Sequence, residues 1–194
     1  PRGAILKVSA ASNHLLDHVG NAVVFSDYED MLNKIDSIDL NVDENDILIM
    51  KNCGPRGVPG IPEWGQILIP KKLLDRNITD IIRISDARMS GTSFGTVILH
   101  SSPESELGGP LSIVKNGDKI KLNASKKQLD LMLSEDEIKD RLKNVKKSKS
   151  EHLRGYPRLY IDHVLQADEG CDFDFLLPSD PNNENLIEPI VGKS

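Results

Sequence analysis

Two glycine-rich segments carry the side chains of this sequence that are best suited to chemistry. The first, 52–63, reads N-C-G-P-R-G-V-P-G-I-P-E and ends in the carboxylate of Glu63. The second, 84–95, reads I-S-D-A-R-M-S-G-T-S-F-G and presents the hydroxyl of Ser90. Glycine lets the backbone approach a ligand closely, and proline stiffens a loop by fixing φ. A stiff loop ending in a carboxylate, together with a loop presenting a hydroxyl, indicates part of an active site.

Glu63 has a functional and a structural interpretation. A carboxylate at the end of a stiff loop suits a hard cation such as Mg²⁺, which prefers oxygen ligands. One carboxylate does not make a metal site, so further ligands must come from elsewhere. A helix-capping or ion-paired glutamate is an equally good interpretation of the same position.

Ser90 can act as a nucleophile or proton carrier only when a base or a nearby cation activates it. His100 and His163 are candidate bases in principle. The loop is not a G-x-S-x-G nucleophile elbow, because Arg88 occupies the first glycine position. The alternative is a serine whose hydroxyl satisfies the backbone of its own turn. Asp86 and Arg88, in the same loop, are interpreted as supporting rather than catalytic residues.

Composition narrows the class of protein. The chain has 194 residues, of which 38% are hydrophobic and 28% charged, as is usual for one globular domain. A net charge of −6 argues against a nucleic acid or an anionic membrane as partner. No apolar run approaches the roughly 20 residues that span a bilayer, and no signal peptide is recognisable. We therefore expect a cytoplasmic protein.

The two cysteines, Cys53 and Cys171, lie far apart in the sequence, so they indicate neither a disulfide framework nor a local metal site. We interpret them as unpaired thiols. The chain begins at Pro1, without methionine and directly in a strand-like segment, and this start suggests a fragment or a processed product.

Hydrophobic periodicity and turn residues predict the elements that position the two loops. Strands are expected at 3–9, 22–25, 46–50, 81–84, 96–100, 111–114, 119–123 and 129–133. Helices are expected after a capping box at Ser26 and Glu29, over Pro70 to Leu74, from a capping box at Ser134 and Glu137 to about Val145, and over Leu159 to Gln166.

The connections between these elements are also predicted. The Asn116-Gly117-Asp118 sequence is expected to form a hairpin between the strands at 111–114 and 119–123. Lys146, Lys147 and Lys149 indicate an exposed connection, and the chain from Asp174 onward reads as an irregular tail. Many short strands with few helices favour one β-rich α/β domain over a doubly wound sheet.

Three motifs resemble a known enzyme family: G-P-R-G-V-P-G-I-P-E at 54–63, S-D-A-R-M-S-G-T at 85–92, and S-P-E-S-E-L-G-G-P at 102–110. They are similar to the C-terminal domain of the dehydratases that act on dihydroxy acids, 6-phosphogluconate and sugar acids. The chain resembles the arabinonate and xylonate branch of this family in three places: the text D-A-R-M-S-G, the C-G-P opening and the segment that begins at Arg154. Dihydroxy-acid dehydratases tend to carry D-G-R-F-S-G and E-G-P instead.

The resemblance implies a fold and a partner. The fold would be a swivelling β/β/α domain like the C-terminal domain of aconitase, with a barrel-like sheet and a few flanking helices. It would cover residues 1–194 as a single domain, with a helix and tail in 151–194. The missing N-terminal domain would provide the cysteines of an iron–sulfur cluster and most ligands of a Mg²⁺ ion. The complete protein would be a homo-oligomer whose size the sequence leaves open.

The resemblance also implies an activity, the conversion of an aldonate such as arabinonate or xylonate to its 2-keto-3-deoxy acid. Glu63 matches the metal ligand of the family's C-terminal domain, and Ser90 matches the serine assigned as base. Thr92 is a candidate for binding the substrate carboxylate, because it lies two residues after Ser90. Two alternatives remain, a dihydroxy-acid dehydratase and a non-catalytic binding domain with the same fold.

The chain departs from the family at its cysteines. An iron–sulfur cluster needs three or four protein ligands in one pocket, and neither Cys53 nor Cys171 matches a cluster ligand of the family. We therefore expect that this chain alone binds no cluster and has no dehydratase activity.

Overall fold

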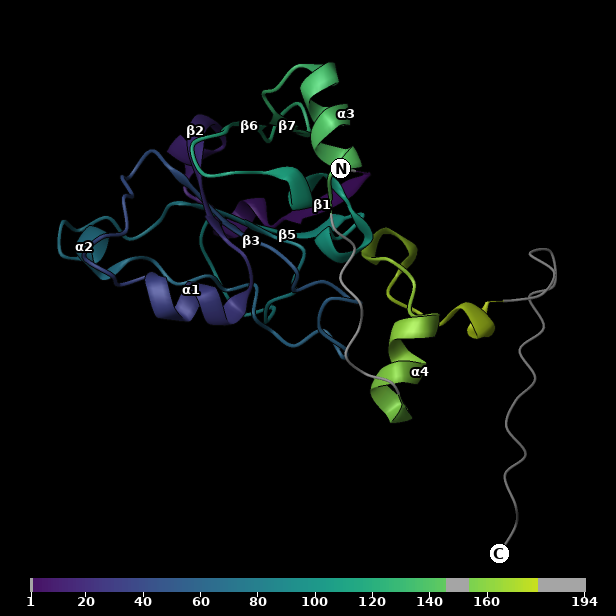
Figure 1. The fold of residues 1–194 in the computed structure, drawn as a ribbon. Helices are drawn as coiled ribbons and strands as arrows, with labels where there is room; N and C mark the ends of the chain where they lie inside the picture. Colours follow the sequence, from purple (N-terminus) through teal and green to yellow (C-terminus); the bar gives the residue numbers. More distant parts are fainter. Residues whose placement is uncertain (1, 146–153, 178–194) are drawn as a thin grey trace, which may run out of the picture.

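The computed structural model describes residues 2–145 and 154–177. Within these residues, seven strands form one mixed, curled sheet, and four α-helices flank it (Figure 1). The strands are β1 (Gly3–Leu6), β2 (Asp17–Phe25), β3 (Ile47–Met50), β4 (Ile82–Ser85), β5 (Val97–Ser102), β6 (Lys119–Asn123) and β7 (Gln128–Leu131). The α-helices are α1 (Tyr28–Lys34), α2 (Lys71–Leu74), α3 (Glu135–Lys143) and α4 (Gly155–His163). The 3₁₀ helices are η1 (Val8–Ala10), η2 (Asn13–Leu15), η3 (Ser105–Leu107), η4 (Pro110–Ile113), η5 (Ala167–Glu169) and η6 (Asp174–Leu176).

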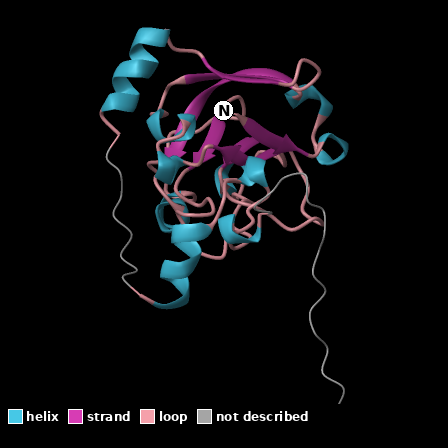
Figure 2. Cartoon of the chain, turned by 90° about the vertical axis from the view of Figure 1, so that its right-hand side faces the viewer, coloured by secondary structure: helices cyan, strands magenta, loops and turns pink. Residues whose placement is uncertain are grey.

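The strand order is β1-β5-β4-β3-β2-β6-β7. The four central strands, β5, β4, β3 and β2, run parallel, whereas β1, β6 and β7 add antiparallel edges. This is the α/β class with a curled, β-rich sheet that the sequence predicts. Figure 2 shows the strands gathered on one side of the molecule and loops filling the other.

The centre of the sheet is buried on both faces, as parallel strands usually are. All four residues of β3 are fully buried. Because side chains alternate between faces, Leu48 and Met50 join the cluster with Phe25 and Met31, whereas Ile47 and Ile49 pack in a second cluster with β4 to β6. The central strands are therefore a rigid base for the loops that leave them.

Several predicted elements are confirmed, with small shifts at most ends, although β2 already begins at Asp17 and the prediction began at Ala22. The strands at 22–25, 46–50, 81–84, 96–100, 119–123 and 129–133 correspond to β2 to β7, and the helical turn after Pro70 is α2. The Ser134 hydroxyl accepts a hydrogen bond from the Glu137 amide and begins α3 as expected. The predicted first strand ends at Leu6, where η1 follows after Lys7.

The prediction of a strand at 111–114 is wrong. This segment is the 3₁₀ helix η4, with Pro110 at its first position. Proline fixes φ near the helical value and has no N–H to donate to a ladder, so Pro110 suits the first position of a helix better than the entry to a strand. The Asn116-Gly117-Asp118 turn exists, with Gly117 at φ +83°, but it leads from η4 into β6 and is not a hairpin.

Two predicted helix starts also differ. Asp27 rather than Ser26 caps α1, because its carboxylate accepts the Asp30 amide at 2.8 Å. The helix expected at 159–166 is α4, which begins at Gly155 and ends at His163. At the predicted tail, residues 174–176 form η6. The lysines 146, 147 and 149, and the tail beyond residue 177, lie outside the described residues.

Candidate functional site

Three neighbouring parallel strands deliver loops to the same edge of the sheet. β3 leads into the first glycine loop at Asn52, β4 leads into the second at Asp86, and β5 leads into the loop that contains Glu104. Ligands of α/β sheets bind at this carboxyl edge of the parallel strands. The strand order therefore brings together the three motifs noted in the sequence.

Asp86 joins all three loops. Its side chain is fully buried, and its two oxygens accept the amides of Cys53 at 2.9 Å and Ser105 at 2.8 Å. Burial raises the pKa of Asp86, while the hydrogen bonds from these amides oppose that rise. These contacts agree with the expectation that Asp86 supports the site.

Glu104 is a second buried carboxylate, and it holds the first glycine loop. It is 1% exposed and accepts hydrogen bonds from the amides of Arg56 and Gly57, the latter at 2.9 Å. A Cβ added to Gly54 would lie 2.6 Å from Glu104 Oε2, so this close approach requires glycine. Burial raises the pKa of Glu104, against the effect of the hydrogen bonds it accepts.

Glu63 lies next to the second loop. Its Oε1 is 2.9 Å from Arg88 Nη1, and both side chains are about half exposed, at 48% and 42%. Arg88 Nε also donates to the Ile61 carbonyl, and the Gly65 amide donates to the Arg88 carbonyl at 2.7 Å. The structure therefore brings the two glycine loops together through Arg88. The ion-paired alternative for Glu63 describes the arrangement seen here.

Ser90 and Thr92 lie together on the turn that follows. Their hydroxyl oxygens are 3.0 Å apart, and the Thr92 amide points to Ser90 Oγ at 3.4 Å. Lys7 reaches the same turn from the end of β1 and donates to the Gly91 carbonyl at 2.8 Å. Ser90 thus caps its own turn, as the structural interpretation predicts, and its hydroxyl also has a second hydroxyl as neighbour.

The two candidate histidines have other surroundings. Within residues 2–145 and 154–177, no hydrogen bond joins either of them to Ser90. His163 pairs with Asp174 at 2.8 Å. His100 adopts φ +53°, and its Nδ1 is buried with no hydrogen-bond partner. Burial and the nearby charge of Arg88 lower the pKa of His100. A histidine-activated serine is therefore not assembled by the described part of the chain.

The donor groups of the chain differ in what they could offer a metal. Among the described residues no group of three or more His, Cys, Asp or Glu could hold a metal ion. Glu63 is about half exposed, so its carboxylate could give one oxygen ligand to a cation whose other ligands come from elsewhere. Cys53 is 1% exposed, donates to the Lys51 carbonyl, and has a pKa strongly raised by burial. Burial also raises the pKa of Cys171. A thiolate is the ligand form of cysteine, and burial disfavours it at both positions.

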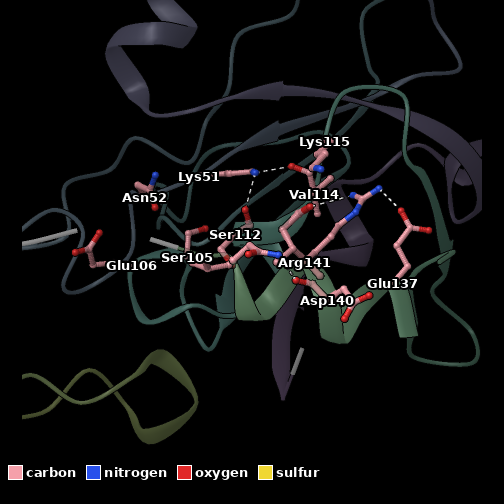
Figure 3. Close-up of a pocket in the computed structure, with 13 residues that line it drawn as sticks. Lys51, Asn52, Ser105, Glu106, Ser112, Val114, Lys115, Glu137, Asp140 and Arg141 are labelled. Atoms are coloured by element: carbon pink, nitrogen blue, oxygen red, sulfur yellow. Dashed lines mark hydrogen bonds and ion pairs between the residues drawn. The ribbon is translucent and has the colours of Figure 1, made fainter. Parts of the chain in front are cut away.

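A pocket of about 840 Å³ lies behind these loops, between the end of β3 and α3 (Figure 3). Two of its charged groups, Lys51 and Arg141, already have hydrogen-bond partners. Lys51 Nζ donates to the carbonyls of Ser112 and Val114, and Arg141 binds Glu137 at 2.7 Å as well as Asp118. Glu63, Ser90 and Thr92 do not line this pocket, so it is separate from the candidate site.

Comparison with known proteins decides the family. The C-terminal domain of the dihydroxy-acid/6-phosphogluconate dehydratases matches residues 1–171. The chain belongs to this family. No helix in the part of the chain that the structure describes is long and apolar enough to cross a membrane.

Relatives within the family share this part of their sequence. The chain is 51% identical over 176 residues to an L-arabinonate dehydratase of Rhizobium leguminosarum bv. trifolii, covering 91% of this chain and 30% of the relative. It is 46% identical over 176 residues to a 6-deoxy-6-sulfo-D-gluconate dehydratase of Pseudomonas putida, with the same coverage. It is 37% identical over 173 residues to a dihydroxy-acid dehydratase of Thermodesulfovibrio yellowstonii, covering 88% of this chain and 30% of the relative. The chain thus spans about 30% of the length of these curated relatives.

Sequence reasoning selected Glu63 and Ser90 but assigned no role to Glu104 or Gln166. Gln166 is 5% exposed and exchanges two hydrogen bonds with Glu104. The available signal was the first of the two glutamates inside S-P-E-S-E-L-G-G-P. Nothing in the sequence predicted which backbone amides its carboxylate binds.

Proposed function

We propose that residues 1–194 form the C-terminal swivelling domain of a sugar-acid dehydratase, which converts an aldonate such as arabinonate or xylonate to the 2-keto-3-deoxy acid. The observation that carries the proposal is the contact between the two family loops, where Arg88 Nη1 lies 2.9 Å from Glu63 Oε1. This contact gathers one metal-ligand candidate and one base candidate on adjacent loops. The complete enzyme would be a cytoplasmic homo-oligomer with an additional N-terminal domain.

The roles of the residues follow from their chemistry. Glu63 would give one oxygen ligand to Mg²⁺, and most other ligands would come from the N-terminal domain. Mg²⁺, when bound, would supply the positive charge that lowers the energy of an anion at C2 and favours deprotonation of a nearby hydroxyl. Ser90 Oγ, deprotonated, would take the C2 proton, and the 3-hydroxyl would leave as water. The resulting enol would tautomerise to the 2-keto-3-deoxy acid. Thr92 would bind the substrate carboxylate through its hydroxyl, which lies 3.0 Å from Ser90 Oγ.

The iron–sulfur cluster of the family would be held by the N-terminal domain. The described surroundings of Cys53 and Cys171 do not suit cluster ligands, so we assign no step to these thiols. The aldonate substrate is favoured over a dihydroxy acid because identity to the arabinonate dehydratase is 51% and to the dihydroxy-acid dehydratase 37%.

The complete protein assayed against a panel of aldonates and dihydroxy-isovalerate tests this proposal. We expect 2-keto-3-deoxy acid from at least one pentonate. Turnover of dihydroxy-isovalerate alone would establish the other dehydratase branch. Binding of an aldonate without turnover by cluster-loaded, Mg²⁺-supplied protein would establish the non-catalytic alternative.

The role of Ser90 is tested in the same assay by Ser90→Ala. A positioned proton transfer contributes roughly 10²–10⁴-fold, so kcat should fall by about that factor. Ser93→Ala, three residues further along the same loop, is the control and should leave kcat within about threefold. Equal rates for Ser90→Ala and the wild type would remove the base role.

A further inference from the structure

We infer that the segment after α4 braces the Glu63 loop, and that Glu104 and Gln166 are positioning residues for the proposed metal ligand. The inference rests on the proposed function for the role of Glu63. The brace itself rests only on contacts within this chain.

The brace begins at the buried pair of Glu104 and Gln166. The Glu104 amide donates to Gln166 Oε1 at 2.8 Å, and Gln166 Nε2 donates to Glu104 Oε1 at 2.6 Å. The two side chains are 1% and 5% exposed. Because each buried polar group would be costly without a partner, the pair defines one relative position of the two segments.

The Glu104 carboxylate also binds the first glycine loop, so it fixes where this loop lies relative to Gln166. Its oxygens lie 3.0 and 2.9 Å from the Arg56 amide nitrogen, and Oε2 lies 2.9 Å from that of Gly57. The Arg56 guanidinium in turn donates to the carbonyl of the fully buried Val164, two residues before Gln166. The loop is therefore held through backbone and side chain to one short segment.

The path continues to Glu63 without a gap. The Val58 amide donates to the Gly54 carbonyl at 3.0 Å, and the Ile61 amide donates to the Val58 carbonyl at 2.9 Å. The Ile61 carbonyl accepts Arg88, which pairs with Glu63. The links through Val58 and Ile61 are hydrogen bonds within the first glycine loop, which prolines stiffen, and the last two links run through Arg88 of the second loop. We therefore expect a change at Gln166 to alter the position of the Glu63 carboxylate.

The position of α4 shows which part of the chain forms the brace. In Figure 1, α4 lies at the periphery of the molecule, away from α3 and the strands. The segment from Val164 to Cys171 returns from it to the body, where Asp168 contacts Ser102 and Arg2. The C-terminal segment is thus built into the support of the site, although it lies about 100 residues after the Glu63 loop in the sequence.

Hydrogen exchange in this chain tests the brace. Gln166→Met keeps the side-chain volume and removes both hydrogen bonds to Glu104, and Gln166→Ala removes the volume as well. We expect the Arg56 and Gly57 amides to exchange at least about tenfold faster in both variants, since about 1.4 kcal/mol of lost protection corresponds to tenfold. Unchanged protection of these two amides in folded Gln166→Met would overturn the brace.

Asn123→Ala is the matched control. Asn123 is a buried amide, 6% exposed, whose Oδ1 accepts the Lys126 amide and the Ser125 hydroxyl. It pairs with Asp17 at the opposite end of β2 from the glycine loops. Asn123→Ala should destabilise the fold by a similar amount and leave Arg56 and Gly57 protection within about twofold. Equal loss of their protection in this control would show a global effect and overturn the brace.

Calorimetric Mn²⁺ titration of the complete protein tests the link to Glu63. We expect Gln166→Met to raise the Mn²⁺ dissociation constant at least about fivefold, or about 1 kcal/mol, whereas Asn123→Ala should not. Faster loop exchange with unchanged Mn²⁺ affinity would overturn the positioning role. If the complete wild-type protein turned over no aldonate, the proposed substrate would fail, while exchange and Mn²⁺ binding would still decide the brace.

Discussion

At the scale of the residue, the state of Glu63 depends on how strongly Arg88 holds it. The pair is 2.9 Å apart, but both side chains are about half exposed, at 48% and 42%. An ion pair in such a solvated position contributes only about 0–1 kcal/mol. A divalent cation with several ligands can therefore replace Arg88 as the partner of Glu63 with only a small loss of free energy from the ion pair. The ion-paired and the metal-ligand interpretations of Glu63 are compatible states of one side chain.

This weak pairing predicts that Glu63→Gln changes metal dependence and not stability. The amide is a poorer ligand for Mg²⁺ than a carboxylate. In the complete protein, we expect the Mg²⁺ concentration for half-maximal activity to rise at least about tenfold, which is about 1.4 kcal/mol. Thermal unfolding should show a loss of less than about 1 kcal/mol. The measurements are a Mg²⁺ titration of activity and a calorimetric melt.

Glu44→Gln is the control for this prediction. Glu44 forms an ion pair of similar exposure with Arg76, at 2.6 Å and 45% and 53% exposed. Loss of that pair should have the same small effect on stability and none on the Mg²⁺ titration. Identical titrations for Glu63→Gln and Glu44→Gln would remove Glu63 from the metal site.

At the scale of the element, Asp80 holds the start of β5 by binding Thr96, the residue just before this strand. Its carboxylate accepts the Thr96 amide and hydroxyl, the Ser12 hydroxyl at 2.7 Å, and the guanidinium of Arg83 at 3.0 Å. Arg83 is 3% exposed and Asp80 10%, so this is a buried pair. Burial raises the pKa of Asp80, but the bonds from Thr96 and Ser12 and the charge of Arg83 outweigh it and lower the pKa below 3.8.

This lowered pKa predicts a pH dependence for Asp80→Asn. An acid whose folded pKa is below its unfolded pKa stabilises the fold above the unfolded value and loses that effect as pH falls through the folded one. Asp80→Asn should cost about 3–5 kcal/mol at pH 7, because Arg83 loses its buried partner. The cost should shrink as the pH falls below 3.8. Urea unfolding at a series of pH values measures both.

The exposed Asp39 gives the comparison. Asp39→Asn should change stability by less than about 0.5 kcal/mol at every pH. A loss for Asp80→Asn that stayed constant from pH 7 to pH 3 would contradict an ionised Asp80 as the stabilising form.

The same elements show how far the sequence predicts this fold. β3 and β4 were predictable because the isoleucine-rich segments 47–50 and 81–84 are a strong local signal for strands. The segment 111–114 has similar residues, but Pro110, which fixes φ and has no N–H to donate, favours the 3₁₀ helix η4. Glu63 and Ser90 stood out because their loops are local motifs. Gln166 did not, because its partner Glu104 lies 62 residues away and only the folded chain brings them together.

At the scale of the whole molecule, the question is what this chain can do alone. It spans about 30% of the length of its curated relatives, and its described residues present one metal-ligand candidate on an exposed face. Burial also favours the thiol form of its two cysteines, whereas the ligands of a cluster are thiolates. Cys53 is buried, donates to the Lys51 carbonyl, and has its pKa raised by burial. A cluster needs three or four thiolates or equivalent ligands in one pocket.

We therefore predict that the purified chain binds substoichiometric iron and sulfide and dehydrates no aldonate. The measurement is iron and acid-labile sulfide per chain after anaerobic reconstitution, with the complete protein treated in parallel. Cys53→Ser and Cys171→Ser in the complete protein should keep its full iron and sulfide content, because neither thiol is proposed as a ligand. Stoichiometric iron in the chain alone, or loss of the cluster in either variant, would show that these cysteines do take part. In that case the assignment of the cluster to a separate N-terminal domain would have to be abandoned.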